Sequence, residues 1–416
     1  MKKSNTIWID ISELKNWTGS FTGIQRTVYN IAKNLVEDES LNVKLCRFDY
    51  RRKSFIESEY QFTEYVNTQP IQTIKQAPKR SLMSVVKKAM PTSLKRRIKS
   101  VISYTTPPYI SVKPKVEFFD DDAIFLAGAF WTGQLAGVKE VQENVRVKVS
   151  AVMYDMVPVM MPELCTEVTV IDFNREVKQA INLVDAWVAI SENTKNDLIK
   201  YAEGHKISID NNKVSVIRLG SDINTDGPSK APFTSKEQPS EFILFVSTIE
   251  ARKNHSLVYQ SIKLANEKGI KLPPIVFVGK QGWHVDDFAS LLERDPEISE
   301  SIIWLKNVDD ASLRWLYQNC LFTIYPSLYE GWGLPVAESI AYGKFSIASR
   351  NSSIPEIAGN LIDYISPYSA QELVDKMAYF SSHKKELKTR TDKLVSVPQA
   401  TWLDATNKIK ETLLSL

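Results

Sequence analysis

The sequence predicts an α/β protein with two domains, each built on a parallel sheet that helices cover on both faces. Short apolar runs of strand length alternate with longer helical patterns over most of the chain, as in sheets of this kind. The length of 416 residues also exceeds that of one ordinary domain. A polar stretch at 221–240 predicts a linker between domains 1–220 and 241–400.

The expected elements alternate in both halves. The predicted strands of the first half are Thr6–Ile11, Leu41–Phe48, Ala123–Leu126, Lys148–Met153, Ala186–Ile190 and Lys213–Ile217, with helices such as Ile24–Val36 and Phe173–Leu183. Those of the second half are Phe242–Val246, Pro274–Val278, Ile302–Leu305, Phe322–Tyr325 and Phe345–Ser349. Apolar residues along one helical face of 401–416 predict a terminal helix, which docks on its own domain or crosses back to the first.

Composition and charge favour an ordinary globular protein. A net charge of +3 is too small to argue for nucleic acid as a partner. The three cysteines are widely spaced and match no metal or disulfide pattern, which favours reduced thiols and a cytoplasmic location. We find no signal peptide at the N-terminus and no run of 18 apolar residues, so a membrane-spanning segment is not expected.

One insert, residues 65–116, breaks the α/β pattern. It contains no acidic residue but eleven lysines and arginines, and apolar side chains recur among them at helical spacing. Basic amphipathic helices of this kind bind anionic membrane surfaces, at ~1 kcal/mol per cation. We therefore expect 75–99 to contact a membrane; a solvated or partly disordered insert remains the alternative, and a nucleic-acid arm is less favoured.

The most informative motif is the stretch from Glu330 to Glu338, which reads as strand, glycine turn and helix. Pro335 suits the first helical position and Gly343 suits the helix end. Such a turn directs free backbone amides, at the positive end of a helix, toward an anion or sugar oxygens. The alternative interpretation is an ordinary strand-to-helix turn, with one glutamate on the surface and the other in the first turn of the helix, where it complements the helix dipole.

Other candidate residues follow the ends of predicted strands, where ligands bind in parallel sheets. Arg252 and Lys253 follow one strand, and two adjacent cations there predict a clamp for a diphosphate. Gly279 lies in a glycine loop after the next strand, and Val308 follows a third, where it could line a slot for a base.

In the first half, Gly23 begins a helix at a point where the backbone could approach a ligand. Asp155 follows Tyr154 at the end of a strand, either as a site carboxylate or as a turn residue. Ser191 is expected to cap a helix.

With these residues placed, the chain resembles the retaining glycosyltransferases of family four, whose GT-B fold has two facing Rossmann-like domains and a central cleft. The resemblance rests on Thr248–His255, Phe277–Trp283, Tyr325–Glu338 and Asn351–Gly359. The first half, with Thr22–Arg26 and Tyr154–Asp155, is similar to bacterial mannosyl- and rhamnosyltransferases that build surface polysaccharides. Tyr154 stands where the family often has His, and Thr248 where it often has Arg.

The resemblance implies roles for these residues. Glu338 would hold the ribose of a nucleotide-sugar donor and Glu330 its sugar, while Arg252 and Lys253 would neutralise the diphosphate. Gly23 would approach that diphosphate from the opposite domain. The implied catalytic residues are Asp155, Arg252, Lys253 and Glu330. The implied donor-binding residues are Gly23, Gly279, Val308, Gly331, Trp332, Gly333, Leu334 and Glu338.

The implied activity is transfer of a hexose or deoxyhexose to a lipid-linked oligosaccharide at the inner face of the cytoplasmic membrane, in synthesis of O-antigen, capsule or a similar polysaccharide. GDP-mannose is the first candidate donor, followed by dTDP- and UDP-sugars, and no metal or other cofactor is expected. Retention allows two routes, and we favour front-face attack over a covalent intermediate. A non-catalytic nucleotide-binding relative and a sugar-nucleotide epimerase are the alternatives.

Overall fold

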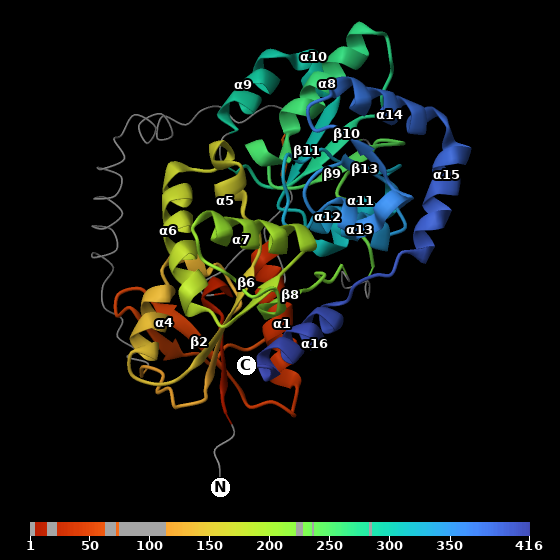
Figure 1. Ribbon diagram of the computed structural model, residues 1–416. Coiled ribbons are helices and arrows are strands. Elements are labelled where there is room, and N and C mark those ends of the chain that lie inside the picture. The colour runs from red at the N-terminus through yellow and green to blue at the C-terminus, as the bar shows by residue number, and fades with distance from the viewer. Residues whose placement is uncertain are drawn as a thin grey trace.

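The computed structural model describes residues 5–14, 23–62, 72–74, 114–221, 228–234, 237–282 and 285–416. It contains two α/β bodies, and Figure 1 shows the first half of the chain as the lower body and most of the second half as the upper one. Each body has a sheet with helices packed on its faces. The predicted fold class is confirmed.

The first sheet, in the part of the chain that is described, has seven strands in the order β3-β2-β1-β5-β6-β7-β8. Its strands are β1 (Ile7–Asp10), β2 (Val43–Asp49), β3 (Ser54–Glu57), β5 (Ala123–Leu126), β6 (Lys148–Met153), β7 (Ala186–Ala189) and β8 (Val214–Val216). All pairs are parallel except β2 with β3. The helices of this body are α1 (Gly23–Glu37), α4 (Leu135–Gln142), α5 (Val157–Met160), α6 (Glu167–Leu183) and α7 (Glu192–Gly204).

The second sheet also has seven described strands, in the order β14-β13-β12-β9-β10-β11-β4. They are β9 (Ile243–Val246), β10 (Ile275–Val278), β11 (Ile302–Lys306), β12 (Thr323–Tyr325), β13 (Ser346–Ser349), β14 (Asp363–Ile365) and β4 (Gln72–Ile74). Only β4 is antiparallel to its neighbour among these described strands. The helices of this body are α8 (His255–Glu267), α9 (Asp286–Arg294), α10 (Pro296–Glu300), α11 (Asp310–Asn319), α12 (Leu334–Ala341), α13 (Pro355–Ala358), α14 (Ala370–Ser382) and α15 (Lys384–Asp392), and the last described helix, α16 (Trp402–Leu414), lies on the first body.

Every strand predicted from an apolar run is present within one or two residues of its expected bounds. Three described strands were not predicted: β3, β4 and β14. Each lies at the edge of its sheet, where one side is unpaired and a continuous apolar run is not required. The helices expected within 82–102 lie outside the described residues.

Both sheets reverse their strand order at one point. In the second sheet, the chain proceeds from β9 to β10 and β11 and then returns to β12 on the other side of β9. In the first sheet, the reversal falls between β1 and β5. The carboxyl ends of strands at such a reversal leave a crevice, which is the usual ligand site of open α/β sheets.

The two bodies share segments as well as an interface. The strand β4, which comes from the basic insert, pairs with β11 of the second sheet. The terminal helix α16 packs against α1 of the first body, with Ile409 and Leu413 buried, and Lys410 pairs with Asp38 at 2.5 Å. Figure 1 shows α16 beside α1 in the lower body. Among the described helices, none is both long and apolar enough to span a membrane.

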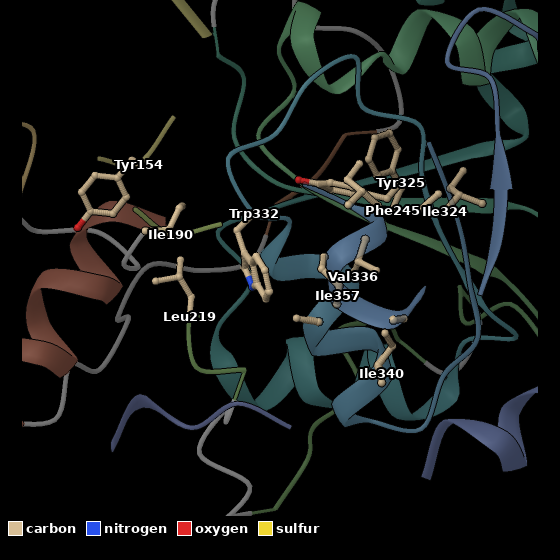
Figure 2. Close-up of a cluster of buried hydrophobic side chains, with 14 of the residues drawn as sticks. Tyr154, Ile190, Leu219, Phe245, Ile324, Tyr325, Trp332, Val336, Ile340 and Ile357 are labelled. Atoms are coloured by element: carbon tan, nitrogen blue, oxygen red, sulfur yellow. The ribbon is translucent and has the colours of Figure 1, made fainter. Parts of the chain in front are cut away.

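A buried apolar cluster joins the bodies. Figure 2 shows the indole of Trp332, from the second body, between Ile190 and Leu219 of the first body and the residues Val336 and Ile357 of its own. All five side chains are at most 9% exposed. Burial of such side chains contributes about 1.5–3 kcal/mol each, which favours the closed arrangement of the two bodies.

Candidate active site

The predicted cations and the first predicted carboxylate meet at the reversal point of the second sheet. Arg252 and Lys253 lie in a short 3-10 helix (Ala251–Lys253) directly after β9, and Glu330 follows the neighbouring β12. Lys253 Nζ lies 2.6 Å from Glu330 Oε1, and Arg252 Nη1 lies 2.7 Å from Oε2. Because Glu330 is only 6% exposed, this is a buried three-charge cluster at a ligand-binding edge.

Neighbouring polar groups fix the cluster. Tyr325 donates a hydrogen bond to Glu330 Oε1 at 3.0 Å and accepts one from Lys253 Nζ at 2.7 Å. Ser327 donates to the same carboxylate oxygen, and Arg252 also pairs with Glu250 at 2.9 Å. Sequence reasoning did not assign Tyr325, Ser327 or Glu250 to the site, although Tyr325 and Ser327 lie inside the motif that it singled out.

The electrostatics favour an ionised cluster. Burial alone would raise the pKa of Glu330, but Arg252 and Lys253 outweigh it and lower that pKa to about 2. Burial and the adjacent Arg252 lower the pKa of Lys253. Burial opposes the charge of Arg252 too, yet Glu330 and Glu250 raise its pKa. A diphosphate at this point would give both cations a second anionic partner.

The turn after Glu330 ends at a helix N-terminus. Gly333 has a φ of 121°, which favours glycine, and its carbonyl accepts hydrogen bonds from Val336 and Ala337 within the first turn of α12. Among the described residues, none accepts a hydrogen bond from the amides of 331–334. Gly343, with a φ of 62°, follows the end of the helix, as predicted.

The first body contributes Tyr154 and Asp155, which follow β6. A Cβ on Gly331 would lie 1.9 Å from the carbonyl oxygen of Tyr154 and 2.9 Å from Cβ of Asp155, so the backbone of the first body occupies the space beside this glycine. Asp155 Oδ1 accepts a hydrogen bond from Val157 N at 3.1 Å, as a turn residue does. Burial raises the pKa of Asp155, and the nearby Arg252 opposes that rise. Asp155 is thus a turn residue that also faces the charged cluster.

Glu338 lies one turn into α12 and is 4% exposed. One oxygen of its carboxylate pairs with Arg26 of the first body, and the other accepts a hydrogen bond from Tyr317 at 2.8 Å. Arg26 lies within the motif Thr22–Arg26, but the sequence predicted no role for it. Its position in the first turn of the helix that starts at Gly23 could have indicated that it lies near the site.

The N-termini of two helices from opposite bodies meet beside this pair. A Cβ on Gly23, the first residue of α1, would lie 3.7 Å from Leu334, the first residue of α12. The partial positive ends of both helices therefore lie near one point, together with Arg26. Such a point attracts anions.

Three further predicted donor-binding residues have structural contacts of their own. Gly279 follows β10, where a Cβ would clash with Ser247 O at 2.0 Å, and its carbonyl accepts a hydrogen bond from Trp304 at 2.9 Å. Val308 is partly buried against an apolar cluster of the second body. Trp332 belongs to the interdomain cluster of Figure 2 and is 5% exposed. Their contacts with a donor stay predictions.

Polar contacts also bridge the bodies at a second place. Glu356 accepts hydrogen bonds from the backbone amides of Glu192 and Asn193, each at 2.8 Å, at the N-terminus of α7. The hydroxyl of Tyr329, next to Glu330, donates to Asp197 of α7. The predicted cap of this helix, Ser191, is confirmed. These bridges bring the first body up to the loop of Glu330.

An Asp-x-Asp sequence at 120–122 directly precedes β5, and its last carboxylate binds backbone amides. Asp122 is buried and accepts hydrogen bonds from Thr6 N at 2.9 Å and Phe119 N at 3.1 Å. It joins the starts of two neighbouring strands. In the described ranges, no group of three or more His, Cys, Asp or Glu residues could hold a metal ion.

Comparison with known proteins supports the family resemblance. Residues 229–393 match the family model described as "Glycosyl transferases group 1". This match begins inside the stretch predicted as a linker. The chain is 28% identical over 198 residues to the serotype-specific mannosyltransferase WbdA of Escherichia coli, covering 45% of this chain and 24% of that protein. It is 32% identical over 142 residues to the O-antigen chain mannosyltransferase B of Escherichia coli, covering 32% and 37%.

Solved structures share the fold along the whole chain. The structure of Anabaena Alr3699/HepE in complex with UDP and glucose superposes with a TM-score of 0.62 at 14% identity, covering 99% of this chain and 100% of that one. The lipopolysaccharide outer core galactosyltransferase WaaB superposes with a TM-score of 0.53 at 13% identity, covering 99% of both chains. At these identities the likeness concerns the fold alone.

The chain spans only 24% and 37% of the length of these two mannosyltransferases. The segment that matches the family model, residues 229–393, holds Arg252, Lys253, Glu330 and Glu338. This segment is similar to the glycosyl transferases of group 1, and the chain as a whole has the two-domain GT-B fold.

Proposed function

We propose that this protein transfers a hexose or deoxyhexose from a nucleotide-diphosphate sugar to a lipid-linked glycan during synthesis of a cell-surface polysaccharide. The observation that carries the proposal is the buried cluster of Arg252, Lys253 and Glu330 at the strand reversal, with Asp155 of the other body beside it. Mannose from GDP-mannose is the first candidate, because the matched relatives are named mannosyltransferases. UDP-sugars come next, since HepE has been solved with UDP and glucose.

The proposed chemistry retains the anomeric configuration and uses no metal ion. The bond between the sugar's anomeric carbon and the diphosphate breaks, and the acceptor hydroxyl attacks the same face. Its proton passes to the departing phosphate oxygen. Arg252, Lys253 and the amides of 331–334 would stabilise the charge that develops on the diphosphate, a kind of stabilisation for which single donors are worth ~2.7–4 kcal/mol.

The carboxylates would then have separate tasks. Glu330 would hold the donor sugar and keep both cations in place, Glu338 would hold the ribose, and Asp155 would orient the acceptor hydroxyl. A covalent intermediate would instead require a carboxylate on the face of the sugar opposite the diphosphate. Replacing Asp155 by Ala and by Asn distinguishes the two routes. If Asp155 were a nucleophile, wild type would form a glycosyl-enzyme that can be trapped, and both variants would lose this intermediate.

The test is a transfer assay with GDP-mannose, UDP-glucose and dTDP-rhamnose, each offered with membrane extracts that contain lipid-linked oligosaccharides. We expect one donor to yield an extended glycan lipid, with unchanged yield in the presence of EDTA and an anomeric configuration, read by NMR, that matches the donor. Binding of a donor without any product would favour a non-catalytic relative. Conversion of a donor in the absence of acceptor would favour an epimerase.

We further propose that residues 75–99 contact an anionic membrane, which would place the enzyme at the inner face of the cytoplasmic membrane beside a lipid-linked acceptor. The segment carries nine lysines and arginines and no acidic residue. Attraction to anionic lipid at ~1 kcal/mol per cation is sufficient for binding at low salt. Vesicles with and without phosphatidylglycerol test this: retention should require the anionic lipid, weaken in high salt and disappear when 75–99 is deleted.

A further inference from the structure

The contact that the proposed function leaves unexplained is the pairing of Arg26 with Glu338. Arg26 comes from α1 of the first body, whereas Glu338 lies on α12 of the second. One carboxylate oxygen pairs with Arg26 Nη1, and the other accepts a hydrogen bond from Tyr317 at 2.8 Å. Both oxygens of the carboxylate that would hold the ribose are therefore already engaged.

A ribose diol binds a carboxylate by donating from its two hydroxyls, so it competes with these two neighbours for the four acceptor directions of Glu338. Tyr317 is fixed, because it is fully buried and its ring stacks on Tyr342 with centroids 5.1 Å apart. The Arg26 side chain is 26% exposed and that of Glu338 is 5% exposed. Arg26 is thus the neighbour that can leave.

A guanidinium displaced from Glu338 keeps only the more weakly acting Asp310 as an anion and gains from a new one, because a poorly paired charge in a mostly buried place is destabilising. The diphosphate of the donor would supply one. Gly23 and Arg26 share the first turn of α1, and Gly23 lies against Leu334 at the start of α12. The donor diphosphate is expected at this meeting of helix ends, within reach of a side chain as long as arginine.

We propose that Arg26 exchanges partners when the donor binds. The ribose takes its place on Glu338, and the guanidinium moves to the diphosphate. This inference rests on the proposed function. It makes Arg26 a specificity-determining residue: a nucleoside displaces Arg26 from Glu338 and offers it no anion in return, whereas a nucleoside diphosphate supplies both the diol and a new partner.

The exchange also links donor binding to the arrangement of the two bodies. Arg26 belongs to the first body and the diphosphate clamp of Arg252 and Lys253 to the second. When the guanidinium moves from Glu338 to the diphosphate, the link between the bodies passes through the ligand. A bound donor therefore replaces an ion pair between the bodies by a bridge of its own.

The test compares nucleosides with nucleoside diphosphates by isothermal titration calorimetry, using guanosine with GDP and uridine with UDP. For the pair that binds wild type, R26A should bind the nucleoside about tenfold more tightly and the diphosphate about tenfold more weakly. R26Q, which retains most of the side-chain volume, should behave in the same way and guards against a packing defect. K253A is the matched control, because it should weaken binding of the nucleoside diphosphate and leave binding of the nucleoside unchanged.

Two results would overturn the exchange. Unchanged or weaker nucleoside binding in both Arg26 variants would mean that the ribose does not displace Arg26. Unchanged diphosphate binding would mean that the guanidinium does not move to the phosphates. If wild type binds no nucleoside diphosphate, the proposed function itself fails; if wild type binds and transfers normally but the Arg26 variants bind like wild type, only the exchange fails.

Discussion

Lys253 donates a hydrogen bond of 2.6 Å to Glu330, so the cation and the carboxylate of the site hold each other at the edge of the second sheet. Arg252 holds the other oxygen of the same carboxylate. The pairing keeps three charges buried without leaving any of them alone, and it positions two cations where a diphosphate would bind.

Replacing Lys253 by Ala should reduce the turnover number at least a hundredfold, equivalent to ~2.7 kcal/mol of transition-state stabilisation. Glu330 keeps Arg252 as a partner, so the variant should remain folded by circular dichroism. Lys263→Ala provides the control, because this lysine is exposed on α8. Near-normal turnover in the Lys253 variant would remove the cation from the proposed mechanism.

Replacing the two glutamates of the motif should affect different kinetic constants. Glu338→Gln should mainly weaken donor binding, seen as a KM raised about tenfold, because its proposed partner is the ribose. Glu330→Gln should mainly lower kcat, because the carboxylate also holds Arg252 and Lys253 in place. Steady-state kinetics with varied donor measures both, and identical profiles would argue against separate roles.

Gly331→Ala should disturb the contact between the two bodies. The added Cβ would lie 1.9 Å from the carbonyl of Tyr154, so the bodies must separate or the loop must shift. We expect a loss of ~1–3 kcal/mol in the free energy of unfolding and a large loss of activity. Gly343→Ala, at a φ of 62° with open space around it, should cost ~1 kcal/mol and preserve activity. Denaturant unfolding and the transfer assay measure both variants.

The pH dependence of stability should include a contribution from Asp197. Burial raises the pKa of this carboxyl from 3.8 to about 6, against the opposing effects of Asn193 and Lys200. A raised pKa means that its contribution to stability is complete below pH 3.8 and is lost as the pH rises through 6. The free energy of unfolding of Asp197→Asn should therefore rise relative to that of wild type by on the order of 1–2 kcal/mol between pH 4 and pH 7. A constant difference in unfolding free energy across that range would contradict this assignment.

The terminal helix should stabilise the first body. Ile409 is fully buried where α16 packs on α1, so Ile409→Ala should cost ~2–4 kcal/mol by leaving a cavity. Leu403 on the same helix is 59% exposed, and Leu403→Ala should change stability by less than ~0.5 kcal/mol. Equal effects in thermal unfolding would show that α16 does not depend on this contact.

Local sequence patterns were sufficient to predict the central strands and to place the charged residues at the ends of those strands. Apolar runs such as Ala123–Leu126 and Lys148–Met153 became strands with the predicted bounds, because a strand buried on both faces must be continuously apolar. Edge strands such as β3 and β14 carry no such requirement and were missed. Residues that follow a strand in a parallel sheet must lie at its carboxyl edge, which is why Arg252 and Glu330 could be placed on one edge in advance.

The sequence by itself therefore determined the class of fold, the motif from Glu330 to Glu338 and the cations expected to face it. Only the tertiary structure decided which groups meet. Arg26 and Glu338 are 312 residues apart, and Glu356 reaches the start of α7 across 163 residues. Periodicity and strand ends are local properties of a chain, whereas partners of this kind are fixed by strand order and by the packing of one body against the other.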